Sequence, residues 1–282
     1  MIGWIVRLLI LAVCTWFIVS KVGEKWQFDS ELLTGKMPML LIVMVLAFVN
    51  WWLEVWRWKY SLKQIGNCTW SEASRQVFAG LTLNWIMPFT SGDLMARLIP
   101  NKERKQVGLL IYYNRAIMLA MTIIFGMFGV YWYSTEQFAS NILIVLFALL
   151  GLIALGFLAK KVLGRGESIT SKWLLNLSLI SIARYAVFVF QFLLLIKVFN
   201  PEFSIFLILA GVGWVFLFRS VIPSLFGNLG VREASALVFF EGLVDNMALI
   251  LVPSLLIWLV NTVMPSVLGL YYLIRFPVKI AE

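Results

Sequence analysis

Ionisable side chains inside strongly apolar stretches are the residues of this sequence whose type and spacing could do chemistry. Such groups are costly in a membrane and mark functional sites by default. They are mostly arginines with a few carboxylates, namely Glu54, Asp93, Arg97, Arg115, Arg184, Arg219, Arg232 and Glu233. Arginine stays charged, and its planar fork makes paired hydrogen bonds to phosphate. The set therefore predicts a site for an anionic or zwitterionic headgroup and not for a free cation.

Six of these residues are predicted to bind the substrate: Asp93, Arg97, Arg184, Arg219, Arg232 and Glu233. Arg97, Arg219 and Arg232 are expected to form a cationic pocket at bilayer depth. Structural alternatives stand beside this hypothesis, because Arg97 lies four residues after Asp93 and is also able to pair with it or to snorkel to the surface. Arg232 and Glu233 are likewise able to form a structural ion pair with Arg219.

Three polar residues outside this set, Glu54, Gln191 and Asn261, are interpreted mainly as structural, and the position of Arg184 restricts what it faces. Glu54 is expected to pair with Arg57 or Lys59, one turn further along the same span. Arg184 lies in the middle of a span, so it must face a cavity or a carboxylate such as Glu54 or Glu233. Two uncharged amides, Gln191 and Asn261, predict hydrogen bonds between helices and not contacts with a ligand.

Two stretches of the chain share the pattern Pro-x-x-x-Gly-(Asp/Asn)-Leu-x-x-Arg, the first from Pro88 to Arg97 and the second from Pro223 to Arg232. Proline breaks a helix, glycine permits a tight reversal, and Asp or Asn suits the N-cap of a new helix. Asp93 and Asn228 are accordingly the predicted N-caps. The pattern predicts two broken-helix hairpins, with breaks at Pro88, Gly92, Pro223, Gly227, Asn228 and Gly230.

The composition is that of an integral membrane protein. Of the 282 residues, 62% are hydrophobic and 13% are charged, and the net charge of +9 comes mostly from short loops between apolar runs. This distribution indicates positive-inside topology and not nucleic-acid binding. With no His and only two Cys, a transition-metal site is not expected. The sequence predicts a multi-pass protein of the cell inner membrane with both termini in the cytoplasm.

The apolar runs predict an all-α polytopic fold with about six full spans, at residues 2–19, 38–58, 107–132, 141–159, 173–199 and 247–274. A further helix is expected to start near Ser71 and Glu72. The two hairpins are interpreted as re-entrant, although residues 203–222 are also long enough to span. Residues 1–135 and 136–282 then form two inverted halves of one transmembrane domain, residues 1–282, an architecture typical of secondary transporters.

The residues around the two breaks resemble a known family. Asn228-Leu229-Gly230-Val231-Arg232-Glu233 is similar to the Gly-Gly-Leu-Gly-Val-Arg-Glu signature of the lysylphosphatidylglycerol synthase transmembrane region, a flippase-like family. Gly92-Asp93 with Arg97, and Arg57-Trp58-Lys59, resemble two weaker motifs of that family in the same order. The resemblance implies a membrane protein that moves or binds lipids. Asn261-Thr262 stands where the family often has an arginine, and the soluble aminoacyltransferase domain is missing, so synthase activity is not implied.

The function expected from these observations is translocation of a lipid or lipid-linked anionic headgroup, bound between the hairpins near the bilayer midplane. Membrane lipids are the expected partners, and a homo-oligomer or a membrane-protein partner stays open. No cofactor is expected. The sequence has no P-loop, which argues against an ATP-driven pump, and it has neither a Gly-x-Ser-x-Gly motif nor a His for an acid–base triad. One alternative is a membrane-embedded enzyme acting on a phospholipid or polyprenyl phosphate, and the other is a non-catalytic assembly partner.

Overall fold

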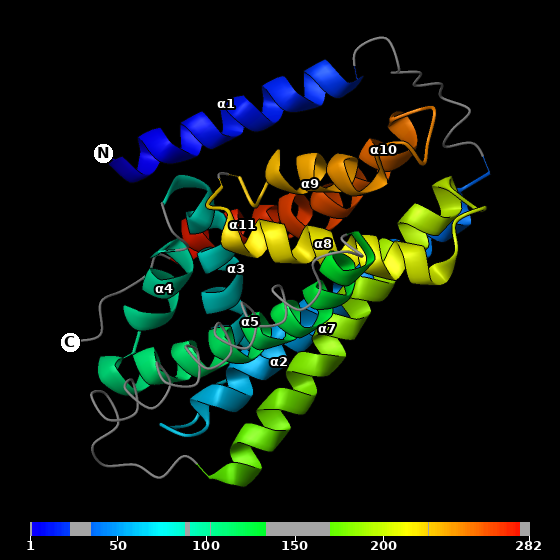
Figure 1. Cartoon of the computed structure of the whole chain (residues 1–282). Helices are drawn as coiled ribbons and strands as arrows, with labels where there is room; N and C mark the ends of the chain where they lie inside the picture. The colour runs from blue at the N-terminus through cyan, green and yellow to red at the C-terminus, as the bar shows by residue number, and fades with distance from the viewer. Residues whose placement is uncertain are drawn as a thin grey trace. The chain divides into compact units, whose positions relative to one another are not determined.

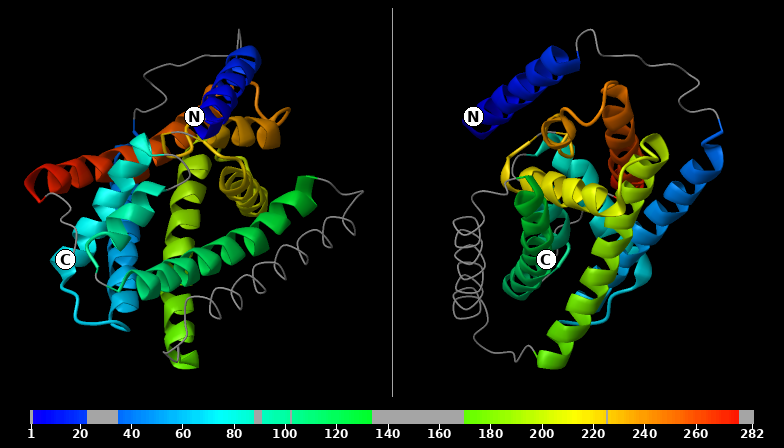
Figure 2. Two further views of the ribbon diagram at one scale, coloured as in Figure 1. Left: turned by 90° about the vertical axis from the view of Figure 1, so that its left-hand side faces the viewer. Right: turned by 45° about the vertical axis from the view of Figure 1, so that its right-hand side comes forward.

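The described part of the chain is helical throughout. The computed structural model describes residues 2–22, 35–87, 91–101, 103–133, 170–224 and 226–276 (Figure 1). No strand occurs within these ranges, which Figure 2 shows from two further sides. This agrees with the predicted all-helical class, as expected for a chain that must satisfy its own backbone hydrogen bonds in lipid.

Five helical segments are long and apolar enough to cross a bilayer. They are α1 (Ile2–Val22), α2 (Met37–Leu62), α5 (Arg104–Tyr133), α7 (Ser171–Phe199) and a last segment that joins α10 (Ala248–Trp258), a π-helical turn (Leu259–Val263) and α11 (Met264–Arg275). They match five of the six predicted spans, and the other, at residues 141–159, lies outside the described residues. The chain is therefore a multi-pass membrane protein.

At each predicted break, two shorter helices pack against each other as a hairpin. The first pair is α3 (Trp70–Ile86) and α4 (Ser91–Leu98), and the second is α8 (Ile205–Val221) and α9 (Val231–Phe240). Glycine allows both close approaches. A Cβ atom at Gly92 would lie 2.4 Å from the backbone of Leu83, and one at Gly211 would lie 2.3 Å from the ring of Phe240. Both interrupted hairpins thus exist, whereas their re-entrant course stays a prediction.

The first hairpin begins with a capping box that includes Glu72, at the predicted helix start near Ser71 and Glu72. Thr69 is the N-cap of α3, and its hydroxyl accepts the Glu72 N–H at 3.2 Å. The Glu72 carboxylate accepts the Thr69 N–H in return, at 2.7 Å. These bonds satisfy two backbone donors that the first helical turn leaves unpaired, so they fix where α3 begins.

Neither predicted N-cap of the helices after the breaks is correct. Asp93 lies in the first turn of α4, which begins at Ser91. In the second hairpin Gly230 is the N-cap of α9, with φ of 86°, while Asn228 lies two residues earlier with φ of 70°. Asn tolerates this left-handed conformation better than most residues, so it serves in the turn while glycine takes the cap. Pro88 lies outside the described residues.

The chain divides into two compact units, which are described separately. Unit 1 comprises Met1–Phe48, Thr122–Leu143 and Val187–Thr262, and contains α1, α8, α9, α10 and the adjoining parts of α2, α5 and α7. Unit 2 comprises Val49–Met121, Ile144–Ala186 and Val263–Glu282, and contains α3, α4, α11 and the remaining parts of α2, α5 and α7. Each unit therefore holds one of the two hairpins.

In unit 1, side-chain amides connect the π-helical turn of the last span to α7 and, through α7, to α2. Asn261, in the π-helical turn, donates to the Ile257 carbonyl at 3.3 Å and to Gln191 Oε1 on α7 at 2.9 Å. Gln191 in turn donates to the Val43 carbonyl on α2 at 2.8 Å. The predicted hydrogen bonding of Gln191 and Asn261 between helices is confirmed. The pair supplies donors where the π-helical turn disturbs the regular backbone pattern.

In unit 2, side chains from four helices form the apolar core that holds the first hairpin in place. Its buried members are Val55, Trp58, Leu62, Ala73, Val77, Val107, Leu110, Ile111, Trp173 and Leu177. Helix α11 packs closely on α3, because a Cβ at Gly269 would lie 2.0 Å from the Phe78 carbonyl oxygen. Thr82 and Trp85 of α3 also donate to the backbone and hydroxyl of Ser266, at 2.7 and 2.9 Å. The end of α3 is thereby fixed beside α11.

Candidate functional site

A single carboxylate, Glu54 of α2, lies at the centre of three arginines in unit 2. Its Oε2 atom is 2.6 Å from Arg57 Nη2 and 3.3 Å from Arg184 Nε, and its Oε1 atom is 2.9 Å from Arg97 Nη2. The side chains of Glu54, Arg57 and Arg97 are 5, 6 and 7% exposed. These ion pairs connect α2, α4 and α7 inside apolar segments.

Asp93 extends this network towards α5. Its Oδ1 atom lies 2.7 Å from Arg97 Nε, and its Oδ2 atom lies 3.1 Å from Arg115 Nη2. The Asp93 N–H also donates to Asn84 Oδ1 at 2.9 Å, which fixes the start of α4 against the end of α3. The Asp93–Arg97 pair expected as a structural alternative is formed. Arg97 therefore bridges the two carboxylates.

We refer to Glu54, Asp93, Arg57, Arg97, Arg115 and Arg184 together as the arginine cluster. It contains four positive and two negative charges, a net charge of +2. Exposure rises across it, since the side chain of Arg184 is 18% exposed and that of Arg115 is 44% exposed. Excess positive charge is unfavourable in an apolar surrounding and attracts anions.

Aromatic side chains support the guanidinium groups of the cluster. The Arg97 Cζ atom lies 4.5 Å from the ring centre of Trp58, which is fully buried and donates to Gln76 at 2.7 Å. The Arg184 Cζ atom lies 5.9 Å from the ring centre of Trp51. Stacking over an aromatic face stabilises a cation without neutralising it. These contacts position the arginines and leave the net charge of the cluster unchanged.

In unit 1, Arg232 and Glu233 form a separate buried pair at the start of α9. Arg232 Nη2 contacts Glu233 Oε1, and Arg232 Nε donates to the same oxygen and to Ser254 Oγ, each at 3.1 Å. Glu233 Oε2 accepts the Gly230 N–H at 2.8 Å. The chain's own carboxylate thus occupies the N-terminal end of α9, the end of a helix that favours negative charge. This pair has no net charge.

The remaining predicted site residue, Arg219, lies over two aromatic rings in unit 1. Its Cζ atom is 4.8 Å from the ring centre of Phe188 and 4.7 Å from that of Phe216. Since Arg97 belongs to unit 2 while Arg219 and Arg232 belong to unit 1, the cationic pocket shared by all three stays a prediction.

The turn between α8 and α9 is closely packed around its glycines. Gly227 has φ of 67°, and a Cβ there would lie 2.3 Å from Thr262 Cγ2. The Trp258 indole donates to the Phe226 carbonyl at 2.8 Å. Ser224 Oγ donates to Asn228 Oδ1. Several of the residues predicted as hairpin breaks therefore build a compact turn held by the end of α10 and by the π-helical turn.

The structure brings together more of the site than sequence reasoning identified. Asp93, Arg97 and Arg184 were singled out, and the expectation that Arg184 faces a carboxylate is met by Glu54. The central role of Glu54 was missed, because its spacing of three from Arg57 was sufficient to interpret it as a local pair. Its convergence with residues from other helices leaves no local sequence signal.

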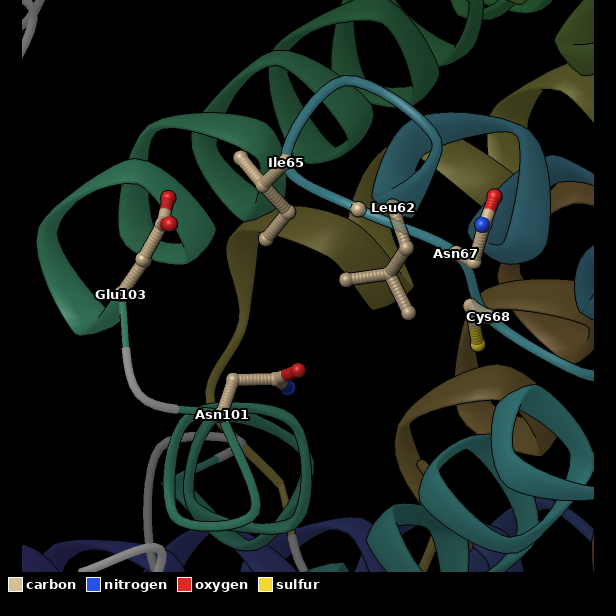
Figure 3. A pocket seen from close by; sticks show the side chains of 7 residues that line it. Leu62, Ile65, Asn67, Cys68, Asn101 and Glu103 are labelled. Atoms are coloured by element: carbon tan, nitrogen blue, oxygen red, sulfur yellow. The ribbon is translucent and has the colours of Figure 1, made fainter.

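A cavity of about 180 Å³ lies elsewhere in unit 2, between the loops that follow α2 and α4 (Figure 3). It is lined by Leu62, Ile65, Gly66, Asn67, Cys68, Asn101 and Glu103. No arginine of the cluster lines it, and its charged lining residue is a carboxylate, so it does not suit an anion. Burial, followed by the nearby Glu72 carboxylate, raises the pKa of the Cys68 thiol to about 11. Within the described ranges, no three His, Cys, Asp or Glu side chains gather as a metal site.

Comparisons with known proteins add no family to this description. The chain matches no protein-family model, and no curated protein is significantly similar to it. The resemblance to the lysylphosphatidylglycerol synthase transmembrane region stays a prediction from the residues around the two breaks.

Proposed function

We propose that the protein binds a lipid with an anionic headgroup and moves it across the membrane. The observation that carries the proposal is the arginine cluster, whose net charge of +2 lies among apolar helices. A phosphate-bearing headgroup would compensate this charge while its acyl chains stay in the bilayer.

The distribution of exposure across the cluster supports a binding role. Arg57 and Arg97 are buried and held by Glu54, whereas Arg184 and Arg115 are more exposed and lie at its rim. The buried residues would set the electrostatic attraction, and the rim residues would touch the headgroup first. Movement of the lipid would follow from alternating exposure of this site, as in transporters built from repeated halves with broken helices.

The test is transport of acyl-chain-labelled lipids in vesicles that contain the purified protein. Phosphatidylglycerol with a fluorescent acyl chain is placed in phosphatidylcholine vesicles. An added reductant quenches only the label in the outer leaflet, and the quenched fraction over time reports movement between leaflets. We expect the protein to accelerate the movement of labelled phosphatidylglycerol, and Arg184→Gln to slow it at least tenfold, the order of effect of one lost charged hydrogen bond. Arg104→Gln is the matched control, because Arg104 is exposed at the start of α5.

The same experiment separates the alternatives. Rates equal to those of protein-free vesicles would contradict translocation. Mass spectrometry of the recovered lipids would reveal a chemically altered headgroup if the protein is an enzyme. If the arginine substitutions change neither transport nor lipids but release a co-purifying membrane protein, the assembly-partner hypothesis replaces this one.

A further inference from the structure

Among the buried hydrogen-bond donors of unit 2 that have no hydrogen-bond partner in the described part of the chain, three lie on α2 and α7 around Glu54. They are the Nε atoms of Arg57 and Arg184 and the indole Nε1 atom of Trp51. Buried donors in folded proteins are nearly always paired, so each such exception calls for a partner from outside the described chain, such as a water or a ligand. All three come from α2 and α7, and none of them forms part of the hairpin turns.

These donors belong to one neighbourhood. Arg57 and Arg184 both contact Glu54 Oε2, and the Arg184 Cζ atom lies 5.9 Å from the Trp51 ring centre. Arg57 Nη1 also donates to Ser181 Oγ at 3.5 Å, one turn before Arg184 on α7. Glu54 Oε2 is itself close to both arginines but is not aligned for a hydrogen bond. Unpaired donors thus outnumber this unpaired acceptor three to one.

We propose that a phosphate monoester at the head of a lipid binds here, with Arg184, Arg57 and the Trp51 indole as its donors. This inference rests on the proposed function, of which it names the lipid class and the contact residues. A phosphate monoester has three terminal oxygens and a charge of about −1.5 to −2 at neutral pH. A phosphodiester has two such oxygens and a single negative charge, so it satisfies fewer of these donors.

The charge of the cluster favours the same class. Its net charge of +2 is balanced by one dianion, whereas a monoanionic diester leaves one positive charge in the apolar region. A zwitterionic headgroup would bring its own ammonium group among the arginines, which is unfavourable. Trp51 contributes a neutral donor, so it selects for the position of an oxygen atom without adding charge.

The experiment measures binding of phosphatidic acid, phosphatidylglycerol and phosphatidylcholine to the detergent-purified protein by native mass spectrometry. We expect phosphatidic acid to bind at least tenfold more tightly than phosphatidylglycerol. Trp51→Phe keeps an aromatic ring and removes the N–H, and should weaken phosphatidic acid binding about tenfold, as expected for one hydrogen bond to a charged group. Trp52→Phe is the matched control, since Trp52 is 46% exposed and its side chain is not among the unpaired donors.

A second variant keeps the proposal testable if Trp51→Phe does not fold. Arg184→Lys retains the charge and loses the planar fork, so it should also reduce the preference for phosphatidic acid by on the order of tenfold. Unchanged binding in the folded variants would overturn the proposed contacts. Equal binding of phosphatidic acid and phosphatidylglycerol would overturn the monoester class while leaving translocation of anionic lipids intact.

Competition with inorganic phosphate tests whether the ligand of this site is a lipid or a free anion. We expect millimolar phosphate to compete weakly with phosphatidic acid, because the free ion lacks acyl chains to anchor it. Saturable binding of inorganic phosphate that depends on Trp51, with no binding of phosphatidic acid, would overturn the assignment to a lipid. Absence of any lipid binding by the wild-type protein would contradict both this inference and the proposed function.

Discussion

Replacing Glu54 with glutamine should strongly destabilise the fold. The substitution keeps the shape of the side chain and removes the negative charge that lies 2.6, 2.9 and 3.3 Å from three arginines. Arg97 retains Asp93 as a partner, but Arg57 and Arg184 lose the carboxylate they share. Breaking a buried ion pair from one side costs about 3–5 kcal/mol, because the remaining charge stays buried.

The assay is thermal unfolding of the purified protein in detergent. A loss of about 3–5 kcal/mol corresponds to a fall in Tm on the order of 10 °C for a chain of this size. Glu241→Gln is the matched control, because Glu241 forms an exposed ion pair with Lys21, the two side chains being 45 and 39% exposed. Such a surface pair contributes less than about 1 kcal/mol, so this variant should melt close to the wild type.

Added sulfate tests whether excess positive charge is the cause. An anion that binds beside the arginines stabilises the folded Glu54→Gln protein and not its unfolded chain, so its Tm should recover with sulfate concentration. Sulfate also stabilises proteins generally, and the Glu241→Gln variant measures that background. If Glu54→Gln melts within about 2 °C of the control, or if sulfate raises both variants equally, the electrostatic account of the cluster is wrong.

Three further predictions concern the first hairpin and the loop that precedes it. Gly92→Ala should prevent the close packing of α4 on α3, since the new Cβ would lie 2.4 Å from the backbone of Leu83. The recovery of monodisperse protein should therefore fall sharply. Gly108→Ala is the control and should not change this recovery, because nothing lies within 4 Å of a Cβ there. Glu72→Ala should lower the free energy of unfolding by about 1 kcal/mol at pH 6 through loss of the capping box. Hydrogen bonds from Thr69 lower the pKa of Glu72 below its ordinary 4.5, so the stabilisation by the ionised carboxylate is present above about pH 4.5. The difference in Tm between variant and wild type should therefore narrow as the pH falls below that value. Cys68, with a pKa of about 11, should react slowly with a maleimide at pH 8, where about one thiol in a thousand is ionised. The reaction rate should rise about tenfold per pH unit. A rate that levels off near pH 9 would contradict the burial of this thiol.

The spans were predictable because apolar runs of sufficient length have few alternatives in a membrane protein. Their ends were less predictable. The second span was expected at residues 38–58, but α2 continues to Leu62, because a helix does not end where its hydrophobicity ends. The following turn carries Lys59 on one side and buried Ser61 and Leu62 on the other. Backbone hydrogen bonding and this packing, and not lipid contact, extend the helix.

The second break illustrates what sequence patterns specify about a turn. Pro223, Gly227 and Gly230 mark an interruption, and the interruption is present. The pattern does not say which residue caps the next helix, because Asn228 and Gly230 are both able to adopt a left-handed conformation. The choice depends on Glu233, which reaches back to the Gly230 N–H and fixes the start of α9.

The candidate site was only partly predictable for a related reason. The cost of burying Arg184 predicted a cavity or a carboxylate beside it, and Glu54 was one of the two carboxylates named. That Arg57 and Arg97 share this carboxylate depends on the packing of α2, α4 and α7, which no local spacing encodes. The unpaired Trp51 indole likewise emerges only from the folded environment, because aromatic residues are abundant throughout this chain.

The amide contacts of Asn261 and Gln191 have a consequence for how the protein responds to its medium. Both side chains are uncharged, so neither titrates nor attracts counterions, unlike the arginines and carboxylates of unit 2. Changes in pH or ionic strength should therefore alter occupancy at the arginine cluster without altering the course of the last span at its π-helical turn. Lipid binding can then be titrated with salt while this part of the framework remains constant.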